Sequence, residues 1–314
     1  MKKLLLVACL LLCLVGCSND SKKLNVGVIH LVQHEALDKA TQGFVDVLTA
    51  EFGEDINIDV QNASGDSATC SVIASNFVSE GVDLIMANAT PALQACANAT
   101  DKIPVLGTSV TEYGVALNID NFNGLVGTNI SGTSDLAPLD EQAQMILDLL
   151  PNTKKVGLLY CSGEANSLYQ VNVVSKYLES KGIKAELYAF ADSNDVSAVA
   201  SQACEDVDAL YIPTDNTCAS NGEVISNAAN VAGVPIITGE KDTCISVDGL
   251  ATLSIDYYEL GKTTGNMAVK ILKGEASVNE MPIEYYANPV KMYSNSAFEK
   301  YNVTIPSEYV AIEE

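Results

Sequence analysis

The sequence contains no arginine and no tryptophan, and it has only two histidines, His30 and His34. Without arginine, the chain cannot clamp a phosphate or carboxylate with a guanidinium group. The 17 basic residues, all lysine, face 40 acidic residues, and the formal net charge of −23 disfavours binding to nucleic acid. With two histidines, few groups can transfer protons, so hydrolytic and metal-dependent chemistry are both disfavoured.

Motifs of common catalytic and cofactor sites are also missing. The sequence has neither a Gly-x-Ser-x-Gly elbow nor a Gly-x-Gly-x-x-Gly loop. Gly261-Lys262-Thr263 resembles the end of a phosphate-binding loop, but the first glycine of that loop would stand at position 256, which is Asp. His30 and His34 have no third metal ligand nearby. We therefore predict a protein that is not an enzyme, with no catalytic residue, metal or cofactor.

The N-terminus has the pattern of an export signal. Two lysines precede an apolar run from Leu4 to Gly16, which is too short to span a bilayer and is typical of a signal peptide. The run ends in Leu14-Val15-Gly16-Cys17, which resembles the bacterial lipobox. That resemblance implies cleavage before Cys17, attachment of lipid (palmitate) to its thiol, and anchoring on the extracytoplasmic face of the membrane. A plain signal peptide with an incidental cysteine is the alternative.

Six further cysteines follow the predicted lipidation site. They stand at positions 70, 96, 161, 204, 218 and 244. An even number of cysteines in an exported chain is compatible with disulfide bonds. Small buried thiols would explain the same residues.

The rest of the chain repeats one α/β pattern. Each half opens with a short apolar strand, continues through a polar loop into a helix, and then alternates strands with helices. The matched segments are 26–30 with 156–160, 81–91 with 206–216, and 103–109 with 234–240. Alternating units with near-continuous apolar strands predict an α/β fold of two doubly wound parallel-sheet lobes.

The segments after residue 250 fit neither copy alone, which predicts that the chain crosses between the lobes. They comprise a strand at 250–256, a helix at 258–272 and a last strand at 285–293. The expected division follows from these crossovers: 1–16 signal peptide; 17–23 lipidated tether; 24–130 and 257–283 the first lobe; 131–256 and 284–314 the second lobe.

These features together resemble the substrate-binding lipoproteins of bacterial ABC importers. Segments 27–38, 87–92 and 212–217 are similar to the subfamily that includes tryptophan-binding lipoproteins. The resemblance implies a type I periplasmic-binding-protein fold with three crossovers, a ligand held between two closing lobes, and a membrane ABC permease as partner. It also implies a monomer and an amino-acid ligand, aromatic and tryptophan-like.

The candidate ligand-binding residues follow the carboxyl ends of the strands, where doubly wound sheets bind ligands. They are Gln33, His34, Thr90, Thr108 and Ser109 in the first lobe, and Ser162, Glu164, Asn166, Ser167, Asp215, Asn216, Glu240 and Asp256 in the second. Hydroxyl groups suit a carboxylate, and carboxylates suit an ammonium group. We therefore assign Thr90 and Ser109 to the carboxylate of an amino acid, and Asp215 to its amine.

Each assignment has a structural alternative. Thr90, Asp215 and His34 could instead cap helices, and Glu240 could be a solvated loop charge. Two other functions also remain open. One is a lipoprotein that presents its bound ligand to a signalling receptor, and the other is a receptor for a nucleoside or a sugar.

Overall fold

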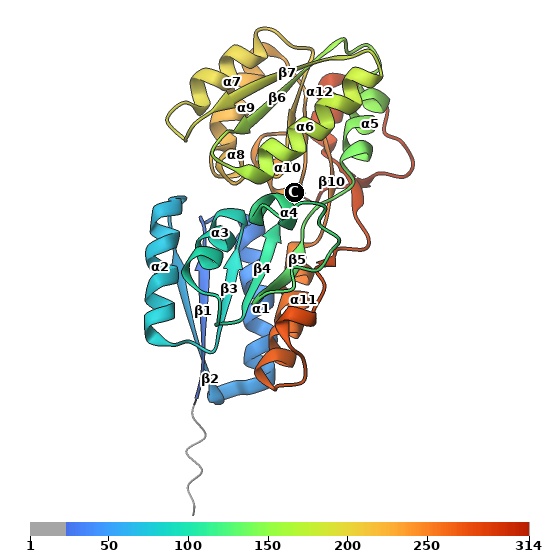
Figure 1. The fold of residues 1–314 in the computed structure, drawn as a ribbon. Helices are drawn as coiled ribbons and strands as arrows, with labels where there is room; N and C mark the ends of the chain where they lie inside the picture. Colours follow the sequence, from blue (N-terminus) through green and yellow to red (C-terminus); the bar gives the residue numbers. More distant parts are fainter. Residues whose placement is uncertain (1–22, 314) are drawn as a thin grey trace, which may run out of the picture.

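The computed structural model describes residues 23–313. The predicted signal peptide and the predicted lipidation site, Cys17, lie outside the described residues. The described part forms two α/β lobes, one above the other in Figure 1, each built on its own mainly parallel sheet. Within this part, no helix combines the length and the apolar character needed to cross a membrane.

The first lobe has a six-stranded sheet in which all neighbouring strands are parallel, in the order β11-β5-β4-β3-β1-β2. Its strands are β1 (Leu24–His30), β2 (Ile56–Asn62), β3 (Leu84–Asn88), β4 (Val105–Val110), β5 (Ile130–Ser134) and β11 (Glu284–Tyr285). Its helices are α1 (Glu35–Phe52), η1 (Gly53–Asp55), α2 (Ser67–Glu80), α3 (Thr90–Ala99), α4 (Tyr113–Leu117), α11 (Tyr257–Leu272) and η2 (Val278–Glu280).

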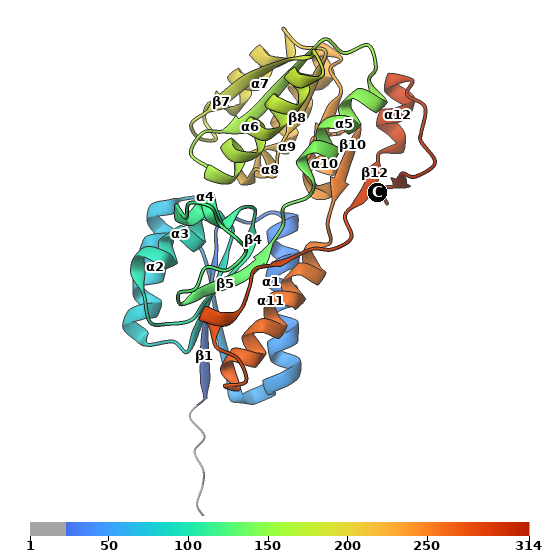
Figure 2. The ribbon, with the colours of Figure 1, turned by 45° about the vertical axis from the view of Figure 1, so that its right-hand side comes forward.

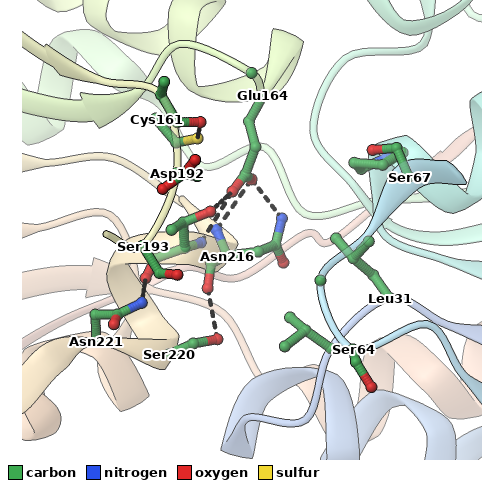
Figure 3. A pocket seen from close by; sticks show the side chains of 16 residues that line it. Leu31, Ser64, Ser67, Cys161, Glu164, Asp192, Ser193, Asn216, Ser220 and Asn221 are labelled. Carbon is green, nitrogen blue, oxygen red and sulfur yellow. Dashed lines mark hydrogen bonds between the residues drawn. The ribbon is translucent and has the colours of Figure 1, made fainter. Parts of the chain in front are cut away.

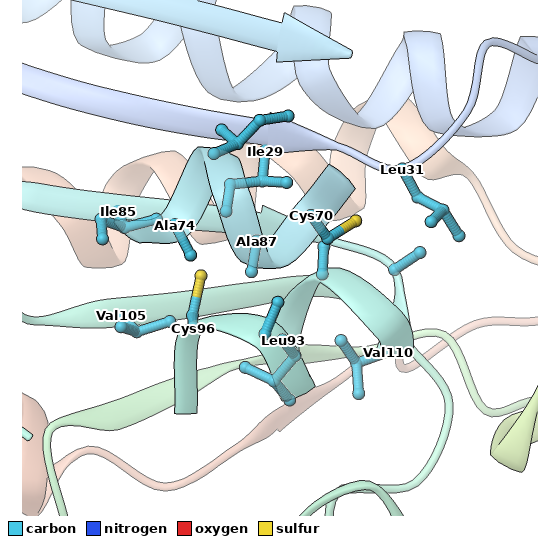
Figure 4. Close-up of a cluster of buried hydrophobic side chains, with 14 of the residues drawn as sticks. Ile29, Leu31, Cys70, Ala74, Ile85, Ala87, Leu93, Cys96, Val105 and Val110 are labelled. Atoms are coloured by element: carbon cyan, nitrogen blue, oxygen red, sulfur yellow. The ribbon is translucent and has the colours of Figure 1, made fainter. Parts of the chain in front are cut away.

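Alternate residues of these strands pack on opposite faces of the sheet. Ile29 and Ala87 face α2 and α3, in the cluster drawn in Figure 4, whereas Val28 and Met86 face α1 and α11. Two covered faces explain why the strands are continuously apolar rather than alternating in polarity.

Three glycines allow α1 and α11 to pack closely, although the two helices are far apart in the sequence. A Cβ atom on Gly43 would overlap the carbonyl oxygen of Tyr258, and one on Gly261 would overlap that of Ala40. Gly265 similarly packs against Val47. Gly261-Lys262-Thr263 therefore lies inside a helix, and its glycine serves packing between α1 and α11 (Figure 2).

The second lobe has a seven-stranded sheet in the order β13-β12-β10-β9-β8-β6-β7, in which only β12 and β10 are antiparallel neighbours. Its strands are β6 (Lys155–Cys161), β7 (Lys184–Phe190), β8 (Ala209–Ile212), β9 (Ile236–Thr238), β10 (Ala251–Ser254), β12 (Val290–Tyr293) and β13 (Val310–Ala311). Its helices are α5 (Leu139–Leu149), α6 (Ala165–Ser180), α7 (Val196–Cys204), α8 (Asn216–Ser220), α9 (Gly222–Ala232), α10 (Lys241–Ser246) and α12 (Asn295–Tyr301).

The chain crosses between the lobes three times, after β5, after β10 and after β11 (Figure 2). Two of the predicted boundaries were slightly wrong. Residues 131–134 belong to the first lobe because β5 pairs with β4, and residues 284–285 belong there because β11 pairs with β5. The single strand predicted at 285–293 is two strands in different sheets, interrupted around Pro289, which cannot donate a ladder hydrogen bond.

All six cysteines of the described part are buried, and none of them forms a disulfide. Burial raises the pKa of the Cys70 thiol to about 11 and that of Cys96 to about 12. Of the two alternatives, the structure therefore supports small buried thiols that fill the core (Figure 4).

Candidate ligand site between the lobes

Loops at the carboxyl ends of both sheets enclose a narrow polar cavity, which we call the interlobe cavity. The first lobe and the crossovers contribute His34, Ala36, Leu37, Ser109, Thr111, Asp135 and Tyr257, and the second lobe contributes Asn166, Thr214, Asp215, Asn216, Ala219, Glu240 and Thr243. The void left between the lining side chains is only about 10 Å³, which is room for about one water molecule, so an amino acid needs a wider separation of the lobes than this structure has.

A larger, more open pocket adjoins the interlobe cavity, and Asn216 lines both. The volume of this outer pocket is about 390 Å³. Figure 3 shows Leu31, Ser64 and Ser67 of the first lobe facing Glu164 and Asn216 of the second across it. It therefore also lies between the two lobes.

Several buried oxygen atoms around the interlobe cavity have no hydrogen-bond partner among the described residues. They include Ser109 Oγ, Asp135 Oδ1 and Asn166 Oδ1, all from residues that line the cavity, and Thr90 Oγ1 at the start of α3. An unpaired buried polar group costs about 1–3 kcal/mol, so such groups require an explanation. A polar ligand in the cavity would provide the missing partners.

Backbone strain occurs in the same loops. Ser109, near the end of β4, has φ 52°, and Ala89, directly after β3, has φ 86°. Residues with a Cβ atom rarely adopt positive φ, and such strain clusters at ligand sites. Both residues stand at the carboxyl ends of strands in the first lobe, where the sequence predicted ligand contacts.

Three buried carboxyl groups line the cavity, and no lysine does. Burial raises the pKa of Asp135 to about 6, and burial with the nearby Asp242 charge raises that of Glu240 to about 7. Burial and the neighbouring Glu164 raise the pKa of Asp215 as well. A ligand with a positive charge would compensate these buried carboxylates.

Asp215 uses most of its acceptor capacity within the protein. Its Oδ1 accepts a hydrogen bond from the Cys218 backbone N–H at 2.7 Å, and its Oδ2 accepts one from the Cys161 backbone N–H at 2.7 Å. The helix-cap interpretation is therefore correct for Asp215, which begins α8. Glu240 likewise caps α10 and is buried, so its interpretation as a solvated loop charge is wrong.

Asp135 has one oxygen free for a ligand. Its Oδ2 accepts a hydrogen bond from the Tyr257 hydroxyl at 3.0 Å, whereas its Oδ1 is unpaired. Asp135 starts the crossover that follows β5, and Tyr257 begins α11 after the crossover from β10. The pair therefore lies on the crossover side of the cavity. The sequence analysis missed Asp135 because β5 was taken as the start of the second lobe.

Glu164 organises the second-lobe side of the site. Its carboxylate accepts hydrogen bonds from the backbone N–H groups of Asn216 and Thr217, the Thr217 hydroxyl and the Asn216 amide (Figure 3). The Asn166 amide also donates to it. Asn216 then reaches across to the first lobe, where its Oδ1 lies 3.2 Å from Nε2 of His34. A second contact between the lobes joins Lys39 Nζ to Asp242 Oδ1 at 2.9 Å.

His34 and Thr90 do not act as helix caps through their side chains. His34 precedes α1 and Thr90 begins α3, but neither side chain accepts a capping hydrogen bond. Ser167 is buried beside Asp215, and Glu164 lines the outer pocket.

Seven predicted site residues do not line the interlobe cavity: Thr90, Glu164 and Ser167, described above, and Gln33, Thr108, Ser162 and Asp256. Gln33 is exposed in a separate shallow groove, and the Thr108 hydroxyl bonds to those of Thr133 and Thr264. Ser162 is exposed and donates to the Phe190 carbonyl, and Asp256 is an exposed cap of α11. These positions follow strands as expected, but their side chains point away from the cavity or bond within one lobe.

Two lobes joined by crossovers, with a polar cavity between them, are the architecture found in solute-binding proteins. A family model described as ABC transporter substrate binding protein matches residues 25–313, and the chain belongs to this family. Proteins of this kind bind a small molecule and work with an ABC permease.

One relative is the tyrosine-binding protein of Clostridioides difficile. It is 38% identical over 271 residues, which cover 84% of this chain and 77% of the relative.

Two solved structures are also similar. The ABC domain of Streptococcus pneumonia in complex with L-Trp is 31% identical with a TM-score of 0.86, and the match covers 91% of this chain and 96% of that one. The ligand-free, open structure of a substrate-binding protein with adhesive properties from Clostridium difficile is 35% identical with a TM-score of 0.68. This match covers 92% of this chain and 99% of that one.

Proposed function

We propose that this chain is the extracytoplasmic, lipid-anchored receptor of an ABC importer and captures an aromatic amino acid between its two lobes. The observation that carries the proposal is the interlobe cavity, in which unpaired buried oxygens and buried carboxyl groups meet without any lysine. An amino acid supplies the ammonium group that these carboxylates lack and a carboxylate that accepts from hydroxyl groups.

The ammonium group of the ligand binds Asp135 and Glu240 in this proposal. Asp135 Oδ1 is buried and unpaired, and Glu240 is buried beside the same cavity. Asp215 then supports the site as a helix cap instead of binding the amine itself. The ligand carboxylate keeps the partners predicted from the sequence, the hydroxyls of Thr90 and Ser109, both of which are unpaired.

The aromatic class of the ligand rests on two supports. The relatives named above include a tyrosine-binding protein and a protein in complex with L-Trp, at 38% and 31% identity. The cavity also has apolar lining for a ring in Ala36, Leu37 and Ala219.

Capture works by closure of the lobes. Residues of both lobes line the cavity, so a ligand makes all its contacts only in the closed form and shifts the equilibrium toward that form. The TM-scores support a nearly closed arrangement here: the score is 0.86 with the tryptophan complex but 0.68 with the open structure, although the latter has the higher identity. The closed form is the one that docks on the permease.

A thermal-shift assay on a variant that starts at Ser18 tests the proposal. The panel contains the twenty amino acids, nucleosides and common sugars. A ligand at 100 times its dissociation constant adds about 2.7 kcal/mol of stability. We expect a clear shift with tyrosine, tryptophan or phenylalanine only. A shift with a nucleoside or a sugar, or none with any amino acid, would overturn the ligand class.

The lipid anchor needs a separate test. In a bacterial host, the full chain should partition with membranes and incorporate a labelled fatty acid, whereas Cys17→Ala should do neither. Equal labelling of both chains would exclude Cys17 as the lipidation site.

A further inference from the structure

The residues around Asn216 determine which end of its side-chain amide faces His34. The Asn216 Nδ2 atom donates to Glu164 Oε2 at 2.6 Å, and the Glu164 carboxylate receives hydrogen bonds from three other groups that can only donate, the two backbone N–H groups and the Asn166 amide. Because a carboxylate accepts, the Nδ2 of Asn216 must face Glu164. Its Oδ1 therefore faces His34, where it lies 3.2 Å from Nε2.

This orientation also fixes the tautomer of His34. An amide oxygen accepts hydrogen bonds, so Nε2 of His34 carries the proton and donates it to Asn216. Burial lowers the pKa of His34, which keeps the ring neutral at pH 7. In a neutral ring with a proton on Nε2, Nδ1 is an acceptor, and it has no hydrogen bond to any residue in the described part of the chain.

The contacts of His34 place it on the opposite side of the proposed ligand from the ammonium group, because it bonds to Asn216 and not to the Asp135–Tyr257 pair. The proposed ammonium partner, Asp135, is on the crossover side with Tyr257. The contact of His34 is with Asn216, which lines both the interlobe cavity and the outer pocket. In the proposed binding mode, an amino acid whose charged end is at Asp135 extends its side chain toward His34 and the outer pocket.

Given the proposed function, on which this inference rests, we propose that His34 selects aromatic amino acids with a hydrogen-bond donor on the ring. Its Nδ1 accepts the phenol O–H of tyrosine or the indole N–H of tryptophan. Phenylalanine has no such donor and leaves Nδ1 unpaired inside the closed site. The receptor should therefore bind tyrosine or tryptophan at least about tenfold more tightly than phenylalanine.

Two substitutions of His34 test this role. The amide nitrogen of His34→Gln can still donate to Asn216 in place of Nε2, but the variant has no acceptor at the position of Nδ1. His34→Asn carries an acceptor near Nδ1 but does not reach Asn216. Isothermal titration calorimetry with tyrosine, tryptophan and phenylalanine gives the ratio of dissociation constants for each variant.

We expect His34→Gln to lose the preference over phenylalanine and His34→Asn to retain part of it. Loss of the contact between the lobes would weaken the binding of all three ligands equally and leave the ratio of dissociation constants unchanged. A change in that ratio therefore reports recognition of the aromatic ring and not closure of the lobes. If the wild type binds phenylalanine as tightly as both others, or if His34→Gln keeps the wild-type ratio, the inference is wrong while the proposed function stands. If none of the three binds, the proposed function itself fails.

Discussion

Replacing Asp135 by asparagine should remove the main partner of the ligand ammonium group while keeping the shape of the side chain. In the structure, Oδ1 of Asp135 is buried and unpaired, and Oδ2 accepts from the Tyr257 hydroxyl at 3.0 Å. The asparagine oxygen can keep the bond to Tyr257, which then turns the amide N–H₂ toward the ligand. A donor would face another donor where the wild type offers a carboxylate.

The size of the effect follows from the charge pair. Opposite charges about 3 Å apart attract by about 5–6 kcal/mol at an effective dielectric constant of about 20, and desolvation offsets part of this. We therefore expect a loss of about 2–5 kcal/mol, typical for removal of one partner of a buried charge pair. This corresponds to a dissociation constant for tyrosine that is roughly 30-fold to 5,000-fold higher.

Isothermal titration calorimetry measures this change, and Asp256→Asn is the matched control. Asp256 was predicted from the sequence as a site residue, but it is an exposed cap of α11, and asparagine also caps helices well. The control should bind within about twofold of the wild type. The reasoning would be refuted if Asp135→Asn bound tyrosine as tightly as the wild type, or if Asp256→Asn lost as much affinity.

Two further predictions concern stability and closure. The folded-state pKa of Asp135, about 6, lies above the ordinary value of 3.8, so its contribution to stability is present below pH 4 and is lost as the pH rises through 6. In thermal unfolding without ligand, the stability of Asp135→Asn relative to the wild type should therefore increase between pH 4 and pH 7. A stability difference between the two proteins that stays constant over this pH range would contradict the prediction. Lys39→Ala removes the contact with Asp242 between the lobes and should weaken tyrosine binding by about fivefold, with a smaller effect in high salt. Lys262→Ala is the control, because its partner Glu259 lies on the same helix, and it should not change tyrosine binding. Equal titration curves for both lysine variants at low salt would rule out this role for Lys39.

The two-lobed fold was predictable because its signals are local and repeated. Strands buried on both faces are apolar throughout, and the matched segments at 26–30 and 156–160 became β1 and β6, the first strands of the two sheets. The exact crossovers were harder to predict. Residues 131–134 are small and polar, a pattern that does not predict a buried strand. They nevertheless form the end of β5, where the Ser131 hydroxyl donates a hydrogen bond to the Met281 carbonyl.

The candidate site was predictable in position but only partly in detail. Polar residues after strands do gather at the cavity, as His34, Ser109 and Glu240 show. The direction of each side chain depends on contacts with residues that are distant in the sequence. A local sequence pattern does not reveal these contacts. The Thr108 hydroxyl is held by Thr133 and Thr264, and the Asp215 carboxylate by the Cys161 backbone, so neither is free to act as predicted.

The central claim is that both charged ends of an amino acid are held between the lobes. Calorimetric titration of the chain from Ser18 with L-tyrosine, tyramine and 3-(4-hydroxyphenyl)propionate tests it most directly, because tyramine lacks the carboxylate and the propionate lacks the ammonium group. We predict that L-tyrosine binds at least about 30-fold more tightly than either analogue, as expected when one partner of a buried charged contact is removed. If either analogue bound as tightly as L-tyrosine, the corresponding end of the ligand would not be held by the protein, and the account would be contradicted.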